Sequence, residues 1–156
     1  MKHILNNKNK KLLYDAWIES TLRYGIEIYG FATEYLIERL QKVQNKMVKI
    51  LFGNGIKHTE ELYKEYKILK VIELRDYIVI TNNYFSKTFK VTKLDKIERL
   101  RRNTTTYEMP RWRNKHGRRI KAWYIPNLFN KIPPKMLQLT SAKEMKKIIK
   151  GYCLNH

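Results

Sequence analysis

Cysteine and long apolar runs are scarce in this 156-residue chain, and each scarcity excludes a class of protein. Cys153 is the single cysteine, which excludes an internal disulfide and is consistent with a reducing compartment. No uninterrupted apolar run approaches the roughly 20 residues that a bilayer-spanning helix needs. The first residues also lack the apolar core followed by small residues that marks a secretory signal. We therefore expect an intracellular protein, cytoplasmic or nuclear, without a membrane partner.

The residue patterns that mark catalytic sites are lacking as well. Two-metal chemistry needs carboxylates that converge on the ions, whereas the three aspartates, Asp15, Asp76 and Asp95, are far apart in sequence. The four histidines show no zinc-ligand spacing apart from Cys153 and His156, which would be half of a zinc site. No serine lies in a Gly-x-Ser-x-Gly elbow, and the six glycines form no phosphate-binding loop. We expect no metal, no cofactor and no catalytic activity from this chain alone.

Positive charge is what the chain has in excess. Lysine and arginine number 33 against 14 aspartates and glutamates, a formal charge of +19. The excess is concentrated late: residues 91–156 hold 17 basic and 4 acidic side chains. Such a surplus repels itself unless an anionic partner or salt neutralises it, which makes nucleic acid the leading candidate partner. Hydrophobic residues still make up 43% of the chain, too many for a disordered protein, so we expect a folded one.

Apolar residues recur at helical spacing through most of the first 90 residues. The spacing predicts a helix from about Lys11 to Tyr29, interrupted or ended by Gly25 and Gly30. Two further helices are predicted over 59–69 and over 74–89. Together with the helix described next, they could close one small core.

The clearest helix pattern begins after Thr33 and stops at Gly53. Its apolar residues alternate at spacings of four and three, and they are Leu36, Leu40, Val43, Met47, Ile50 and Leu51. Two interpretations stay open: an ordinary bundle helix, or a zipper that pairs with itself or with a parent polymerase. Three lysines lie on the opposite face, either as a solvated surface or as a row that contacts phosphates, and they are Lys42, Lys46 and Lys49.

The character of the chain changes after Val91. All four prolines lie in this part, together with short β-prone pieces such as 120–125, so we expect loops and one hairpin. A capping box over 141–144 then opens a last helix. The predicted fold is mainly α, with a helical bundle over 1–90 and, over 91–156, a basic region of loops and short β pieces that ends in a docking helix.

Arginines and aromatic residues alternate between Arg99 and Tyr124. Guanidinium groups match phosphate oxygens and flat rings stack on unpaired bases, so this composition favours a single strand or a hybrid. The candidate contact residues here are Arg99, Arg101, Arg102, Arg111, Trp112, Arg113, Lys115, Arg118, Arg119 and Lys121. The alternative is a solvated loop whose Trp112 and Trp123 are buried as core anchors.

Several short motifs share the order found in one known family. They are Leu13-Tyr14, Tyr24-Gly25, Tyr29-Gly30, Leu40 to Lys46, Ile50-Leu51, His58 with Glu61-Leu62, Ile68-Leu69, Arg102-Asn103 with Pro110, and Pro126 to Pro133. In this order the chain resembles the segment that follows the palm of non-LTR retrotransposon reverse transcriptases. The resemblance covers about Leu12 to Tyr152, and Tyr29 stands where relatives have tryptophan.

The resemblance implies a thumb that grips a template-primer duplex, followed by a basic part that extends the contact. It also implies that the palm, with its paired aspartates, lies upstream, while the intact relatives would be RNA-directed DNA polymerases. The expected function is therefore binding of RNA, single-stranded DNA or their hybrid. The alternative is a protein-interaction or dimerisation module without a nucleic-acid function.

Overall fold

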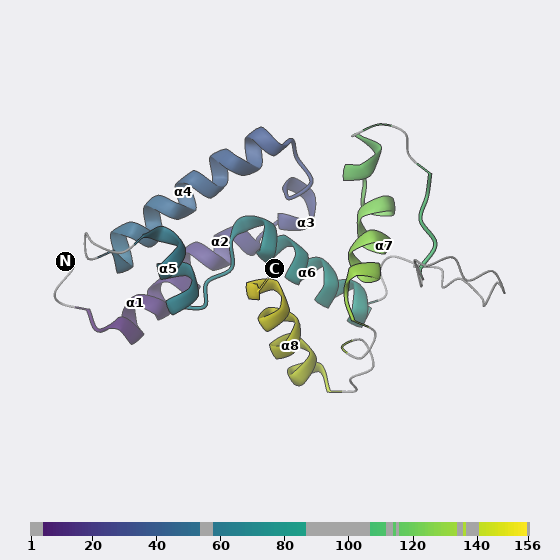
Figure 1. Cartoon of the computed structure of the whole chain (residues 1–156). Coiled ribbons are helices and arrows are strands. Elements are labelled where there is room, and N and C mark those ends of the chain that lie inside the picture. Colours follow the sequence, from purple (N-terminus) through teal and green to yellow (C-terminus); the bar gives the residue numbers. More distant parts are fainter. Residues whose placement is uncertain are drawn as a thin grey trace. The chain divides into compact units, whose positions relative to one another are not determined.

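The computed structural model describes residues 5–53, 58–86, 107–111, 114, 116–133, 136 and 141–155, which are mainly helical (Figure 1). The chain divides into two compact units. Unit 1 comprises Met1–Ile78 and Tyr152–His156, and unit 2 comprises Val79–Gly151. The predicted mainly α class is confirmed. The predicted boundary at residue 90 lies outside the described residues and stays a prediction.

The first helical segment of unit 1 changes its winding along its length. Asn6 caps α1 (Asn7–Leu13) by accepting the Lys8 N–H at 3.0 Å. The chain continues through a π-helical segment, η1 (Tyr14–Glu19), into α2 (Ser20–Arg23). Gly25 has φ 69°, a left-handed conformation that favours glycine, and it separates α2 from α3 (Ile26–Tyr29). The predicted helix over 11–29 is thus broken at Gly25, as its sequence indicated.

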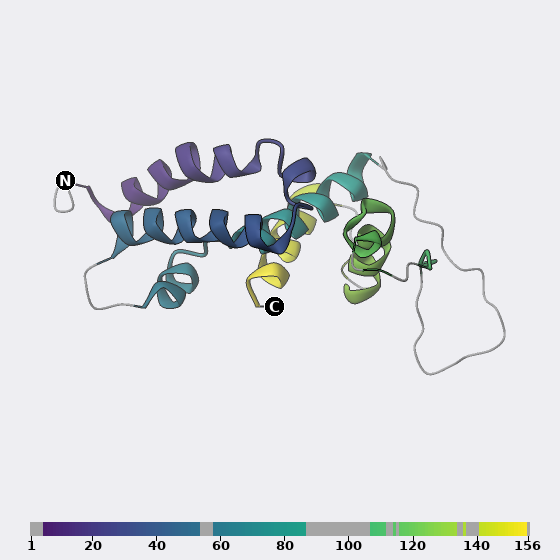
Figure 2. The same cartoon turned by 90° about the horizontal axis from the view of Figure 1, so that it is seen from above.

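The longest helix, α4 (Glu34–Phe52), begins after Thr33 and ends before Gly53, as predicted. It lies beside α1 and η1 (Figure 2) and also contacts α5 (Thr59–Glu65). The next helix, α6 (Val71–Ser86), starts where the Lys70 N–H donates to the Glu73 carboxylate at 2.8 Å. This bond is one half of a capping box.

The apolar core of unit 1 joins these helices. Its buried members are Tyr14, Val48, Phe52, Leu62, Tyr63 and Ile68. The Tyr14 and Phe52 rings lie 6.1 Å apart, and the Phe52 and Tyr66 rings 4.1 Å apart. The core therefore fixes η1 and α5 against the second half of α4.

The four-three stripe of α4, which an ordinary bundle helix would bury, is mostly exposed. The buried residues of α4 are Ile37, Gln44, Val48 and Phe52. The four-three stripe lies about 100° further round, and its exposed members are Leu36, Val43, Met47 and Ile50. Helical periodicity predicted the position of this helix correctly. It did not predict which face is buried, because polar amides occupy part of that face.

Unit 2 contains a short 3-10 turn, η2 (Gly117–Arg119), followed by α7 (Lys121–Lys131) and most of α8 (Ala142–Asn155). The β structure expected over 120–125 is wrong, since this stretch opens α7. Burial explains the difference, because Ile125, Leu128 and Phe129 share one helical face and are all buried. The last helix was predicted correctly from Ser141. None of the helices in the described part of the chain is long and apolar enough to cross a membrane.

Candidate nucleic-acid interface

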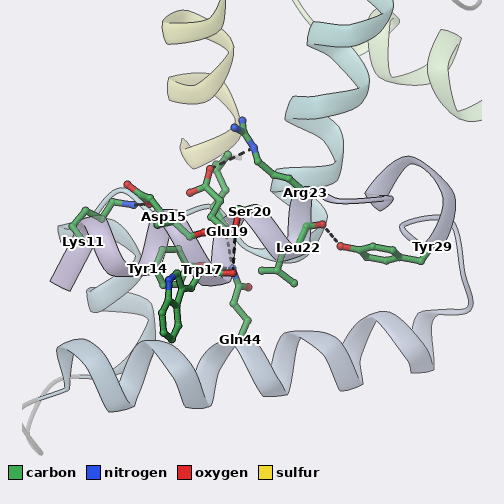
Figure 3. Close-up of polar contacts among 12 residues, drawn as sticks. Lys11, Tyr14, Asp15, Trp17, Glu19, Ser20, Leu22, Arg23, Tyr29 and Gln44 are labelled. Atoms are coloured by element: carbon green, nitrogen blue, oxygen red, sulfur yellow. Dashed lines mark hydrogen bonds and ion pairs between the residues drawn. The ribbon is translucent and has the colours of Figure 1, made fainter. Parts of the chain in front are cut away.

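The orientation of α4 is set by a buried amide. Gln44 is 1% exposed, and its Nε2 donates to the Tyr14 hydroxyl and to the Leu69 carbonyl, both at 2.8 Å (Figure 3 draws the first bond). Its Oε1 lies 2.9 Å from Gln41 Nε2, while Gln41 Oε1 accepts the Val71 N–H at 2.9 Å. These bonds tie α4 to η1 on one side and to the start of α6 on the other.

The network extends to Tyr63, whose hydroxyl donates to Asn45 Oδ1 at 2.8 Å. Burial raises the pKa of both Tyr14 and Tyr63 above the usual range, so both hydroxyls are neutral at physiological pH. In the sequence, Gln41, Gln44 and Asn45 belong to the run Leu40 to Lys46 that carries the family resemblance. In the structure these three amides hold helices together.

The three predicted lysines of α4 lie together on its solvent side. Lys42, Lys46 and Lys49 are all exposed. Their spacing of four and three residues keeps them on one side of the helix over about 10 Å. Within the described stretches no carboxylate lies within ion-pair distance of these three side chains. Their charge is therefore not neutralised by the described part of the chain.

A second group of predicted contact residues lies in unit 2. Arg111, Arg118 and Lys121 are exposed, and Arg119 is half-buried. The turn that presents Arg118 and Arg119 is organised by Asn114, whose Oδ1 accepts the Gly117 N–H at 2.8 Å. This turn leads directly into α7, whose first turn contains no acidic residue. The structure thus places three of these cations, at 118, 119 and 121, around one helix start.

Trp123 follows that helix start. It is half-buried, and the Arg118 guanidinium carbon lies 6.0 Å from the centre of its ring. This contact is a cation–π pair. Trp123 is therefore only partly consistent with the alternative of a buried core anchor, because part of its ring remains accessible to solvent.

Six predicted contact residues lie outside the described residues and stay predictions. They are Arg99, Arg101, Arg102, Trp112, Arg113 and Lys115. Among the described residues, no group of three potential ligands could hold a metal ion.

Sequence reasoning missed an apolar groove on unit 1. It has a volume of about 560 Å³ and lies between η1 and α2 on one side and α4 on the other. The lining residues are Ala16, Trp17, Ile18, Ser20, Thr21, Leu22, Leu40, Val43, Gln44 and Met47. One sequence signal could have indicated the groove: Gln41, Gln44 and Asn45 lie between the apolar residues of α4. Amides that need buried hydrogen-bond partners turn their own face of the helix toward the core, which leaves the apolar stripe exposed.

Comparisons of the chain with protein-family models, with curated proteins and with solved structures found no match.

Proposed function

We propose that the chain binds nucleic acid through sequence-independent phosphate contacts, in the manner of a thumb related to that of non-LTR retrotransposon reverse transcriptases. The observation that carries the proposal is the row of Lys42, Lys46 and Lys49 on the exposed side of α4. A row about 10 Å long matches the rise of about three nucleotides along one strand of a duplex. Three cations at this spacing can neutralise successive phosphates.

Unit 2 supplies a second contact of the same kind. Arg118 and Arg119 sit on a turn that the Asn114 side chain organises, so their backbone is held in place. Arginine offers a planar fork to phosphate oxygens and stacks on flat rings. The pair of Arg118 and Trp123 gives a surface on which an unpaired base can stack. This favours a single strand or a hybrid over a purely electrostatic contact.

Salt dependence tests the proposal. The full chain would be titrated with fluorescent 20-nucleotide RNA, single-stranded DNA and an RNA–DNA hybrid between 50 mM and 400 mM salt. If about five phosphates are neutralised, the log-log slope for a single strand is about −3.5. Replacing Lys42, Lys46 and Lys49 together by glutamine reduces the magnitude of this slope by about 2, because each lost phosphate contact contributes about 0.7.

A matched control removes the same charge elsewhere on unit 1. Lys8, Lys64 and Lys67 are exposed and lie on α1, on α5 and just after α5. Their triple glutamine variant has the same net charge as the α4 variant but leaves the row intact. The proposal fails if the two variants lower affinity and slope equally, or if the parent chain shows a flat slope.

A further inference from the structure

Within the described residues of unit 1, one face of the longest helix, α4, is largely exposed. The stripe follows a heptad pattern in which Leu36, Val43 and Ile50 take one seam position, with Leu40 and Met47 between them. Val43 is 50% exposed and Ile50 is 60% exposed. An apolar surface of this kind on a folded unit marks an interaction site.

The groove beside the stripe is built by the π-helical segment. The wider winding of η1 leaves carbonyl groups that Ser20 and Thr21 satisfy: the Ser20 hydroxyl donates to Ala16 O, and the Thr21 hydroxyl donates to Trp17 O at 2.6 Å. Trp17 projects from this segment toward α4 and is 72% exposed (Figure 3). Its ring forms one wall of the groove, while Val43 and Met47 form the other.

The dimensions of this surface fit a helix. Leu36 to Ile50 is a stretch of 15 residues, or about 21 Å along the helix axis, which corresponds to about four turns of a partner helix. Apolar anchors at four-three spacing on such a partner would meet the stripe and fill the groove, as amphipathic helices do in other grooves.

The charges beside the stripe select the partner. The seam is the line formed by the stripe residues Leu36, Leu40, Val43, Met47 and Ile50. Arg39 and Lys46 occupy the heptad position beside this line, on its open side, which points away from the buried face of α4, and both are exposed. On η1, Asp15 and Glu19 do not line the groove, and they are paired with Lys11 at 2.5 Å and with Arg23 at 3.6 Å. The charged residues that flank the stripe on its open side are therefore basic.

A second copy of the chain fits this surface poorly. In an antiparallel pair the flanking positions face each other, which would bring Arg39 and Lys46 against the same two cations of the other copy. In a parallel pair they would face the positions held by Ile37 and Gln44, which are buried inside unit 1. Both arrangements oppose self-association.

We propose that the groove between η1–α2 and α4 binds an acidic amphipathic helix, with apolar residues at four-three spacing and carboxylates beside them that face Arg39 and Lys46. Lys46 belongs both to this rim and to the proposed nucleic-acid row, whereas the apolar anchors Val43 and Met47 belong to the groove alone. Substitution of Val43 and Met47 therefore tests the groove, and substitution of Lys42 and Lys49 tests the row.

The test uses three fluorescein-labelled 18-residue peptides. One has leucines at four-three spacing with glutamates at the flanking positions, the second has lysines at those flanks, and the third has the composition of the first in scrambled order. We expect the full chain to bind the glutamate-flanked peptide at least tenfold more tightly than the other two. Raising the salt from 50 mM to 500 mM should weaken this binding, since the rim cations are exposed.

Two double variants separate the groove from general charge effects. Val43→Glu with Met47→Glu places carboxylates on the groove wall, and we expect at least a tenfold loss of peptide affinity. Ile28→Glu with Ile72→Glu changes two exposed apolar residues of unit 1 outside the groove and adds the same charge. This control should bind as the parent does. Circular dichroism confirms that each variant is folded.

Four results would overturn the proposal. The first is equal binding of the glutamate-flanked and lysine-flanked peptides, and the second is equal loss in both double variants. The third is a dimer in sedimentation velocity that Val43→Glu with Met47→Glu dissociates, since the occupant would then be a second copy. The fourth is binding to anionic vesicles or to an oligonucleotide that the same groove variant abolishes.

Discussion

Replacing Gln44 by methionine should destabilise unit 1 strongly, although the two side chains have similar length and methionine is apolar. Gln44 is almost completely buried and donates to the Tyr14 hydroxyl and to the Leu69 carbonyl. Methionine leaves both oxygens buried without this donor. An unsatisfied buried polar group costs about 1–3 kcal/mol, so with two such groups the free energy of unfolding should fall by about 2–6 kcal/mol.

Urea denaturation followed by circular dichroism measures the effect, with hydrogen exchange of the α4 amides as a second readout. Glu38→Met is the control, because Glu38 is exposed on the same helix, and it should change the free energy of unfolding by less than about 0.5 kcal/mol. Combining Tyr14→Phe with Gln44→Met should cost less than the sum of the two single changes, because the pair shares a bond. If Gln44→Met behaves like the control, the amide network does not stabilise unit 1.

Three other experiments each test a separate feature of unit 1. Burial raises the pKa of Cys153 to about 12, so iodoacetamide should alkylate it at pH 8 at least about 100-fold more slowly in the folded chain than in urea. Gly30→Ala should lower the free energy of unfolding in urea by about 1–3 kcal/mol, because the new Cβ would clash with the Ile26 carbonyl oxygen and would lie 3.0 Å from Cγ and Cδ of Arg75. The Arg75 guanidinium donates to the Gly30 carbonyl and so limits the movement of this side chain. Burial also raises the pKa of Glu73 above its ordinary 4.5, so the neutral carboxyl group is favoured in the folded chain. The stability that this neutral group contributes is lost as pH rises through the pKa of the folded chain. Glu73→Gln keeps an acceptor for the Lys70 N–H, and thermal unfolding should show it gaining stability over the parent between pH 4 and pH 7.

The sequence predicted the positions of the helices better than their packing. The glycines at 25 and 53 and the residue Thr33 indicated correctly where helices break, end and begin, because these signals act within a few residues. Which face of α4 is buried depends on Tyr14 and Leu69, which are distant in sequence. Hydrophobic periodicity counts a glutamine as a surface residue and could not reveal this.

The error in unit 2 has a similar cause. The stretch 120–125 is rich in aromatic and β-branched residues, and Pro126 follows it, so local preference favoured a strand. In the structure Pro126 lies inside α7 and is buried with its neighbour Ile125. Asn130, later in the same helix, holds Tyr107 through both backbone groups, at 2.9 Å and 3.1 Å. Such long-range contacts decide the local structure and cannot be read from a window of six residues.

The candidate site was predictable where it depends on exposed charge and unpredictable where it depends on packing. Lys42, Lys46 and Lys49 were assigned to one solvent face from spacing alone, and they are exposed on that side of α4. The groove was not predicted: the amides of α4 indicate which of its faces is buried, but the wall formed by Trp17 depends on the π-helical winding of η1. Hydrophobic spacing does not distinguish that winding from an ordinary α-helix.

The buried amide of α4, Gln44, and the half-buried amides beside it should therefore determine which face of the helix meets solvent. Replacing Gln41, Gln44 and Asn45 by leucine removes the side chains that need polar partners. A rotation of α4 by about 100° could then bury the four-three stripe in their place. In a Val43→Cys background, the engineered thiol should react rapidly with a maleimide in the parent chain and at least about tenfold more slowly in the triple-leucine variant.

Peptide binding gives an independent readout, because a stripe turned into the core can no longer receive an acidic helix. The two measurements should change together if the amides hold the helix in its observed orientation. Equal thiol reactivity in both backgrounds would show that other contacts, such as those of Phe52 and Val48 in the core, fix the rotation of α4 by themselves. The exposed stripe would then owe its position to the core and not to the glutamines between its residues.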